Sequence, residues 1–142
     1  MEKLIITIAP TGSLPTKKNN PHVPISPDEI IQTGILCEKA GASIIHIHAR
    51  NPVDETASTD FHIFRQIYQG LKKETNLILQ ISTGGRAGME YEKRSKRLSL
   101  APEMASLTTG SVNFPTSVYI NSPDLICALA KDMKTYGIKP EI

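Results

Sequence analysis

The sequence predicts an α/β fold built on parallel strands, and three observations carry that prediction. Strand-like and helix-like segments alternate along the 142 residues, the pattern of parallel strands joined by crossover helices. The strand-like segments are mostly continuous apolar runs, as in sheets covered on both faces. The segment "APTGSLP", after the first strand, lacks the Gly-rich phosphate turn that often follows the first strand of an open doubly wound sheet. An open sheet and part of a closed (β/α) barrel both remain compatible with the pattern.

Four segments have the composition of buried strands, and a fifth strand begins near the end of the sequence. The four runs are "LIITIA" at 4–9, "SIIHIHA" at 43–49, "NLILQIS" at 76–82 and "EMASLTT" at 103–109. Their short length and their apolar or β-branched content favour strands over helices. The segment "IKPEI" at 138–142 has the pattern of the start of a fifth strand.

Four helices are predicted between these strands. The first begins at "SPDE", with Ser26 as N-cap, Pro27 in the first turn and Glu29 three residues after the cap, and it ends at Gly41. The second covers 59–74 and carries an apolar stripe on one face. The third covers 91–100, and the fourth covers 121–137 and begins with another Ser-Pro-Asp cap.

Composition excludes several classes of protein. Hydrophobic residues make up 39% and charged residues 21% of the chain, which is typical of a soluble globular protein. The net charge of +2 is too small to indicate a nucleic acid or an anionic membrane as partner. The N-terminal segment "MEKLIITIAP" lacks the basic start and the cleavage site of a signal peptide. We therefore expect a cytoplasmic protein with a single domain over residues 1–142.

A basic run, two cysteines and two of the four histidines are expected to have structural and not functional roles. The basic segment "EKRSKR" at 92–97 is interpreted as a solvated helix face. Cys37 and Cys127 lie within predicted helices without a partner at metal-site spacing, so we expect buried, reduced thiols. His22 lies in a Pro-rich loop, and His62 falls on the polar side of the second helix.

Polar residues gather where the predicted strands end. The C-terminal ends read "PTG", "HIHAR", "QISTGG" and "TTGSVNF", and both candidate architectures place functional groups at such ends. Side chains alternate along a strand, so His46 and His48 point to the same face, and Arg50 shares their parity. The two imidazoles fit a shared metal ion, since imidazole is a common zinc ligand. They equally fit a pair of satisfied polar residues inside a barrel.

Two glycine-containing turns follow the third and fourth strands. The turn "STGG" offers the hydroxyls of Ser82 and Thr83 and backbone N–H groups that glycine leaves exposed, so it can bind a carboxylate or a phosphate. The turn "TTGS" at 108–111 repeats this chemistry. For both turns the alternative is a tight turn in which glycine provides a positive φ.

Together these motifs resemble the beta-keto acid cleavage enzymes, a family best known from 3-keto-5-aminohexanoate cleavage enzyme. The motifs are the "TG" after strand one, "NPHVPISPDEI", "AGASIIHIHAR", "QISTGG", "KRLSLAPEMASLTTGSVNF" and "IKPEI". They agree in order and spacing over essentially all 142 residues.

The resemblance implies a zinc-dependent (β/α) TIM barrel, of which this chain holds about half: four βα units and the start of strand five. It also implies an acyltransferase that reacts a β-keto acid with acetyl-CoA to give acetoacetate and a new CoA thioester. The family's zinc-ligating histidines carry over to His46 and His48, where the metal acts as Lewis acid and template. The residues expected to bind the substrate or the thioester are Arg50, Ser82, Thr83, Gly84, Gly85, Thr108, Gly110 and Ser111.

Two departures from the family refine these expectations. Where members with amine substrates carry a glutamate after "TG", this sequence has Leu14, so we expect a neutral or apolar β-keto acid. Family members are about twice as long, and their third zinc ligand, a glutamate, and their catalytic aspartate and arginine lie in the half absent from these residues. Only Glu141 lies near the family's strand-five acidic motif. We therefore expect a weak zinc site, unknown catalytic residues in this chain and no turnover from it alone.

A half barrel exposes two sheet edges and an apolar face, which are liabilities for a monomer. We therefore expect the chain to form a homo-oligomer or to pair with a complementing C-terminal half. The alternative function is a non-catalytic module that binds anions or CoA, or that completes a barrel.

Overall fold

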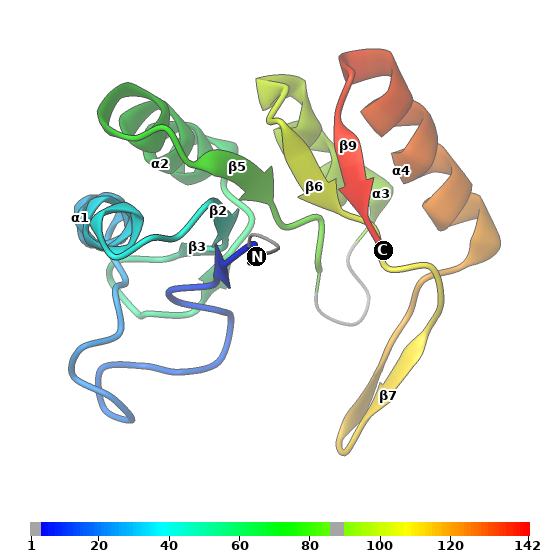
Figure 1. Ribbon diagram of the computed structural model, residues 1–142. Helices are drawn as coiled ribbons and strands as arrows, with labels where there is room; N and C mark the ends of the chain where they lie inside the picture. The colour runs from blue at the N-terminus through cyan, green and yellow to red at the C-terminus, as the bar shows by residue number, and fades with distance from the viewer. Residues whose placement is uncertain (1–3, 86–89) are drawn as a thin grey trace. The chain divides into compact units, whose positions relative to one another are not determined.

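The protein is described here by a computed structural model that covers residues 4–85 and 90–142 (Figure 1). The chain divides into two compact units, Met1–Gln80 and Ile81–Ile142, and each is described by itself. The predicted alternation of strands and helices is confirmed within both units. The first unit contains β1 (Thr7–Ile8), α1 (Pro27–Lys39), β2 (Ile44–Ile47), β3 (Ala49–Arg50), β4 (Ala57–Ser58), α2 (Phe61–Glu74) and most of β5 (Ile78–Ile81).

Strand β2 lies at the centre of the first unit. It pairs in parallel with β1, with Thr7 opposite Ile44. On its other side lies β5, where the Ile78 N–H donates to the Ser43 carbonyl at 3.0 Å. Ile45 and Ile47 are buried, at 0% and 1% exposure. The central strand is therefore part of the core, as its apolar sequence predicts.

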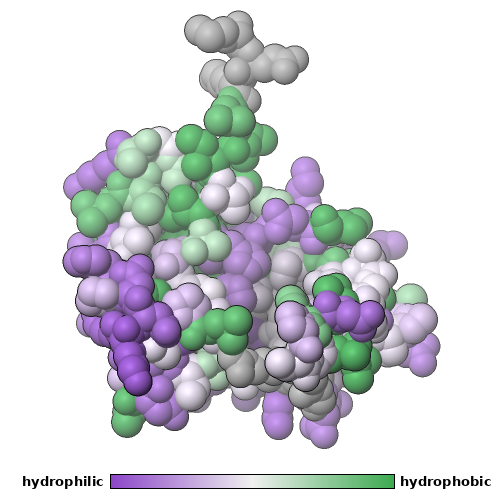
Figure 2. All heavy atoms as spheres, turned by 90° about the horizontal axis from the view of Figure 1, so that it is seen from below, coloured by the Kyte–Doolittle hydropathy of each residue, from purple (hydrophilic) through white to green (hydrophobic). Residues whose placement is uncertain are grey.

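Strand β1 is shorter than the predicted strand at 4–9. Leu4 and Ile5 are exposed, at 84% and 70%, because no neighbouring strand covers them. Figure 2 shows hydrophobic atoms, in green, gathered at one edge of the face in view. The apolar composition of this segment therefore predicted burial that the first unit does not provide.

Helix α1 begins with the predicted capping box. The Ser26 hydroxyl accepts a hydrogen bond from the Glu29 N–H, and the Glu29 carboxylate accepts one from the Ser26 N–H. Lys17 also pairs with the Glu29 carboxylate. Lys17 and the backbone N–H groups of Ser26 and Ile25 lower the pKa of Glu29 to about 2. The start of α1 therefore depends on an ionised Glu29.

Helices α1 and α2 pack closely through two glycines that sequence reasoning did not single out. A Cβ atom at Gly34 would lie 2.5 Å from the Leu71 side chain, and one at Gly70 would lie 2.3 Å from the Ile31 side chain. The apolar stripe predicted for α2 is confirmed, and its buried members are Phe64, Ile67, Tyr68 and Leu71. Figure 1 shows the two helices side by side.

The second unit contains α3 (Tyr91–Ser95), the 3₁₀ helix η1 (Lys96–Leu100), β6 (Met104–Ser106), β7 (Val112–Phe114), β8 (Ser117–Tyr119), α4 (Pro123–Tyr136) and β9 (Lys139–Glu141). Strands β6 and β9 pair in parallel, with Ser106 opposite Glu141, which confirms that a strand begins in 138–142. The core of this unit consists of Leu98, Ala105, Leu107, Leu129, Met133 and Ile138.

Two antiparallel hairpins were not predicted. One pairs β3 with β4 in the first unit, and the other pairs β7 with β8 in the second. The β7–β8 hairpin leaves the apolar side chains of Phe114 and Ile120 more than half exposed, at 57% and 55%. Figure 1 shows this hairpin projecting away from β6 and β9. The side chains of β3 are buried, with Ala49 at 3% and Arg50 at 1% exposure. The strands of both hairpins are only two or three residues long, so no periodic apolar pattern marks them.

Three further expectations need correction. The helix predicted at 91–100 is divided into α3 and η1. Arg94 and Arg97 in the predicted solvated face are buried, at 1% and 3% exposure. The Cys127 thiol is exposed and Cys37 is only partly buried, because both lie on the outer sides of their helices. His62 is exposed on α2, in agreement with its interpretation.

Within residues 4–85 and 90–142, no helix combines the length and the apolar character needed to cross a bilayer.

The Glu29 cap predicts a pH dependence of stability. The pKa of Glu29 is lowered in the folded chain, so its contribution is complete above the unfolded value of 4.5 and is lost as pH falls toward about 2. Because its side chain is 40% exposed, solvent screening keeps this contribution below about 1 kcal/mol. Glu29→Gln keeps an oxygen for the cap and should lower the free energy of unfolding at pH 7, with a gap that narrows between pH 4.5 and 2.

Urea denaturation of both proteins across this pH range measures the effect. The matched control is Glu92→Gln, which removes an exposed carboxylate from α3. A gap between Glu29→Gln and wild type that stays constant with pH would contradict the role of the ionised carboxylate.

Candidate functional site

His46 and His48 come together at the C-terminal end of β2. His46 lies within the strand and His48 directly follows it, and both side chains are partly buried. Their Nε2 atoms lie 3.1 Å apart, and the ring centroids are separated by 4.9 Å. The burial of Ile45 and Ile47 on the opposite face fixes this arrangement, because side chains alternate along a strand.

The neighbouring strand supplies a hydrogen-bond partner for His46. Gln80 lies on β5 and is fully buried, and its Oε1 atom is hydrogen-bonded to His46 Nδ1. A carbonyl oxygen can only accept, so Nδ1 is the protonated nitrogen and Nε2 keeps its lone pair. The lone pair therefore faces His48.

This arrangement fits part of a zinc site. Zn–N bonds of about 2.0–2.1 Å in tetrahedral geometry place two ligand nitrogens about 3.3 Å apart, and the observed separation is 3.1 Å. A second hydrogen bond that orients a metal-ligating histidine is also usual. Within the described ranges 4–85 and 90–142, no group of three or more His, Cys, Asp or Glu residues could hold a metal ion. The chain thus offers two of the ligands that a zinc ion needs.

Arg50 is buried within the first unit and bonded to backbone carbonyls. Its side chain is 1% exposed, and its Nε donates to the Glu55 carbonyl at 2.9 Å. Its Nη1 atom also donates to the carbonyl oxygens of Thr11 and Gly12, each at 3.4 Å. Gly12 has a positive φ of +58°. The guanidinium therefore ties the loop after β1 to the β3–β4 hairpin.

In the second unit, hydroxyl groups organise the turn that follows β5. The Thr83 N–H donates to Ser106 Oγ at 3.0 Å, and the Gly84 N–H donates to Ser82 Oγ at 3.1 Å. Ser82 and Thr83 are buried, at 3% and 1% exposure. Two backbone donors of the predicted anion-binding turn are thus used within the unit itself. Gly85 is partly buried beside them.

Two buried arginines lie next to this turn. Arg94 donates to the Thr83 carbonyl, to Tyr119 Oη and to Asn121 Oδ1, each at 2.8 Å. Arg97 donates to the Gly84 carbonyl at 3.1 Å. Burial lowers the pKa of Arg94, and burial together with the charge of Arg94 lowers the pKa of Arg97 to about 10. Arg97 therefore stays protonated at neutral pH.

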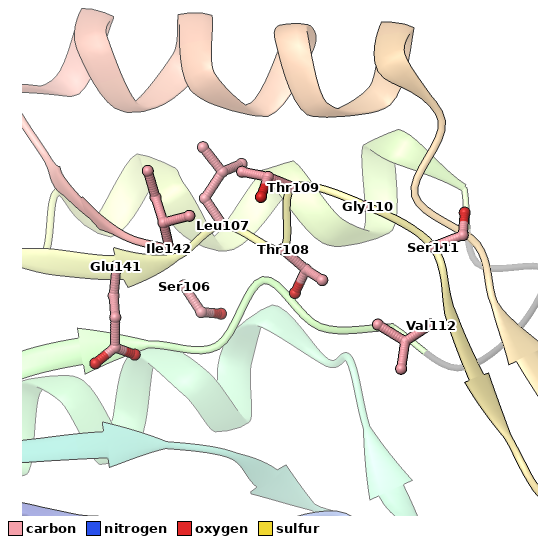
Figure 3. Close-up of a pocket in the computed structure, with 9 residues that line it drawn as sticks. All are labelled: Ser106, Leu107, Thr108, Thr109, Gly110, Ser111, Val112, Glu141 and Ile142. Carbon is pink, nitrogen blue, oxygen red and sulfur yellow. The ribbon is translucent and has the colours of Figure 1, made fainter.

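A hollow of about 500 Å³ with a mixed polar and apolar lining opens beside β6 and β9. Its lining residues are Ser106, Leu107, Thr108, Thr109, Gly110, Ser111, Val112, Glu141 and Ile142 (Figure 3). Figure 3 shows Ser106, Thr108 and Glu141 on one side of this strand pair, and Leu107 and Ile142 on the other. Three predicted residues, Thr108, Gly110 and Ser111, thus lie in one hollow.

Sequence reasoning missed several residues around these sites. Ser106 has the parity of Thr108 on the predicted strand, and this signal was present in the sequence. Gln80 interrupts the apolar residues of "LILQI" at 77–81, and this interruption also marked it. Tyr119 lies in β8 of the unpredicted hairpin, and Asn121 follows that strand. No local pattern could therefore indicate their contacts with Arg94.

The fold and these residues define the class of protein: a (β/α)-type chain with a histidine pair and hydroxyl-rich turns after its strands. A model of the beta-keto acid cleavage enzyme family matches residues 3–142. The chain belongs to this family, as the sequence motifs predicted.

Relatives and solved structures agree with this assignment. The chain is 51% identical over 97% of its length to 3-oxoadipate:acetyl-CoA acetyltransferase of Cupriavidus necator, of which it covers 48%. It is 40% identical over 99% of its length to 3-keto-5-aminohexanoate cleavage enzyme of Acetoanaerobium sticklandii, of which it covers 52%. The chain thus spans about half the length of these curated relatives.

The solved structure titled "Apo structure of ObcA" has a TM-score of 0.74 and 28% identity, over 85% of this chain and 30% of that one. A second, titled "Ternary complex of ObcA with C4-CoA adduct and oxalate", has a TM-score of 0.75 and 27% identity, over 86% of this chain and 31% of that one. The fold is therefore of the (β/α) TIM-barrel type, and the chain forms part of such a barrel.

The contacts of Arg94 predict a large stability effect. Arg94→Met removes the donors for Thr83, Tyr119 and Asn121, and each buried acceptor left unsatisfied costs about 1–3 kcal/mol. We expect a loss of more than about 3 kcal/mol in the free energy of unfolding, measured by urea denaturation. Arg94→Lys should be intermediate. The control Lys93→Met, at an exposed position on α3, should change the free energy of unfolding by less than about 0.5 kcal/mol. Equal losses in Lys93→Met and Arg94→Met would contradict the role given to the Arg94 hydrogen bonds.

Proposed function

We propose that this chain supplies the metal-binding histidines and part of the substrate-binding residues of a zinc-dependent beta-keto acid cleavage enzyme. The observation that carries the proposal is the approach of His46 Nε2 to His48 Nε2 at 3.1 Å, with His46 oriented by Gln80. Family membership and relatives named for acetyl-CoA-dependent transfer support it.

The proposed reaction exchanges acyl groups between two carbon skeletons. In the β-keto acid, the bond between the keto carbon and the adjacent CH₂ breaks, and the acyl group moves to the sulfur of CoA. The acetyl group of acetyl-CoA becomes bonded to that CH₂, which gives acetoacetate. The products are therefore acetoacetate and a new acyl-CoA, and the step needs no oxidant or reductant.

Each unit contributes a distinct chemistry to this proposal. His46 and His48 would hold zinc, which supplies Lewis-acid polarisation of a substrate oxygen when it is bound. Thr108 lines the hollow of the second unit, and its hydroxyl can hydrogen-bond a carboxylate or a thioester oxygen. Ser111 also lines the hollow and stays a proposed substrate-binding residue, although its Oγ already accepts a hydrogen bond from the Asn121 N–H at 3.0 Å. Ser82 and Thr83 order the turn after β5 through their own hydrogen bonds.

The substrate is proposed to lack an ammonium group. Leu14 is 73% exposed in the loop after β1, and an apolar side chain cannot pair with a cation. The relative from Cupriavidus necator is named for 3-oxoadipate, which is a β-keto acid without an amine. We therefore favour a β-keto acid without an amino group, and we keep Arg50, Gly84, Gly85 and Gly110 as proposed substrate-binding residues.

The chain is proposed to be inactive alone. In the described part of the chain, two histidines converge and no third acidic or histidine ligand joins them. Catalysis by groups that act together is lost almost completely when members of the set are missing. Acetyl-CoA remains the proposed co-substrate, and a second copy or a complementing C-terminal half remains the proposed partner, in the cytoplasm. A non-catalytic binding module is the alternative, favoured by the hydroxyl-lined hollow that the second unit forms by itself.

Zinc titration tests the metal site. Wild type should bind zinc weakly, because two protein ligands remain, and His46→Ala should abolish this binding. Competition with a chromophoric chelator gives the affinity, and His62→Ala, at an exposed position on α2, is the matched control. Equal zinc affinity in wild type and His46→Ala would remove the histidine pair from the proposal.

Consumption of acetyl-CoA tests the activity. The chain is assayed with zinc and a panel of β-keto acids without amino groups, alone and with a C-terminal half of a family member. We expect turnover only in the mixture, because the missing ligands come from that half. Turnover by the chain alone would overturn the proposed inactivity. No turnover in either case, with carboxylate or CoA binding that Ser82→Ala abolishes, would favour the binding module.

A further inference from the structure

Gln80 is a fully buried polar residue beside the proposed zinc site. It lies in β5 between the buried side chains of Leu79 and Ile81, and it is 0% exposed. Burying an amide group without full hydrogen bonding costs about 1–3 kcal/mol. Only part of this cost is offset, because Gln80 Nε2 has no hydrogen-bond partner among the residues that the structure describes. An apolar residue at position 80 would cost less free energy to bury, so the amide is expected to have a specific task.

The task follows from the hydrogen bond that the Gln80 side chain makes with His46. Its Oε1 atom is bonded to His46 Nδ1, on the side of the imidazole ring opposite to Nε2. A neutral imidazole has one donor and one acceptor nitrogen, and an amide oxygen requires the donor. Gln80 therefore selects the tautomer that carries its proton on Nδ1. The same bond restrains rotation of the ring, so that Nε2 stays 3.1 Å from His48 Nε2.

We propose that Gln80 is a positioning residue that fixes the tautomer and the ring orientation of His46 for metal binding. This inference rests on the proposed zinc site. Hydrogen bonds of this kind to metal-ligating histidines typically change metal affinity by about 10–100-fold when they are removed. Most such partners are carboxylates, backbone carbonyls or water; an uncharged side-chain amide orients the ring without adding a negative charge to the site.

Two variants separate orientation from burial. Gln80→Leu introduces an apolar side chain and removes the hydrogen-bond acceptor for His46. Gln80→Glu keeps an acceptor oxygen at this position. Chelator competition should show an affinity for zinc that is about 10–100-fold lower in Gln80→Leu, and close to or above wild type in Gln80→Glu. Gln69→Leu makes the same substitution at an exposed position of α2 and should bind zinc as wild type does.

A second measurement needs no zinc. Long-range ¹H–¹⁵N NMR of the metal-free wild-type chain assigns the protonated nitrogen of each histidine. We expect the Nδ1–H tautomer for His46, and its loss in Gln80→Leu. An Nε2–H tautomer in wild type, or wild-type zinc affinity in a folded Gln80→Leu, would overturn the inference.

The two proposals fail in different ways. If His46→Ala binds zinc as wild type does, the proposed zinc site fails, and the inference that rests on it fails too. If His46→Ala abolishes zinc binding and Gln80→Leu leaves it unchanged, the zinc site stands and the role of Gln80 alone is refuted. Circular dichroism of each variant establishes that it is folded.

Discussion

The alternation of side chains along buried strands is the constraint from which the polar groups of this chain take their positions. In β2, Ile45 and Ile47 are buried in the core, so His46 and His48 share the other face. In β6 and just after it, Ala105 and Leu107 belong to the core cluster, which leaves Ser106 and Thr108 on the opposite side. Burial of the hydrophobic residues on one face of each strand thus determines the face on which the polar side chains lie.

This constraint explains how much the sequence could predict. Strand and helix positions followed from periodicity and from caps such as Ser26 with Glu29, because those signals are local. The shared face of the two histidines followed in the same way. The hairpins β3–β4 and β7–β8 did not, because their strands are only two or three residues long. Such short strands show no periodic pattern, even where their side chains are buried, as in β3.

The buried arginines illustrate a second limit of local reasoning. A basic run such as "EKRSKR" is usually solvated, and Lys93 and Lys96 are indeed exposed. Arg94 is buried because its acceptors are Thr83, Tyr119 and Asn121, which come from separate segments of the second unit. Arg97 lies three residues further on the same face. Burial of a charge is decided by such distant acceptors, so composition alone could not reveal it.

The same logic applies to the loop that carries the proposed specificity residue. The buried guanidinium of Arg50 donates hydrogen bonds to backbone carbonyls, including those of Thr11 and Gly12. Arg50 therefore holds the loop after β1 by its main chain. Leu14 follows in that loop with its side chain 73% exposed. Main-chain anchoring leaves the side chain at this position free to differ without changing the fold of the loop. The buried cation of Arg50 therefore holds this loop by its main chain, independently of the side chain at position 14.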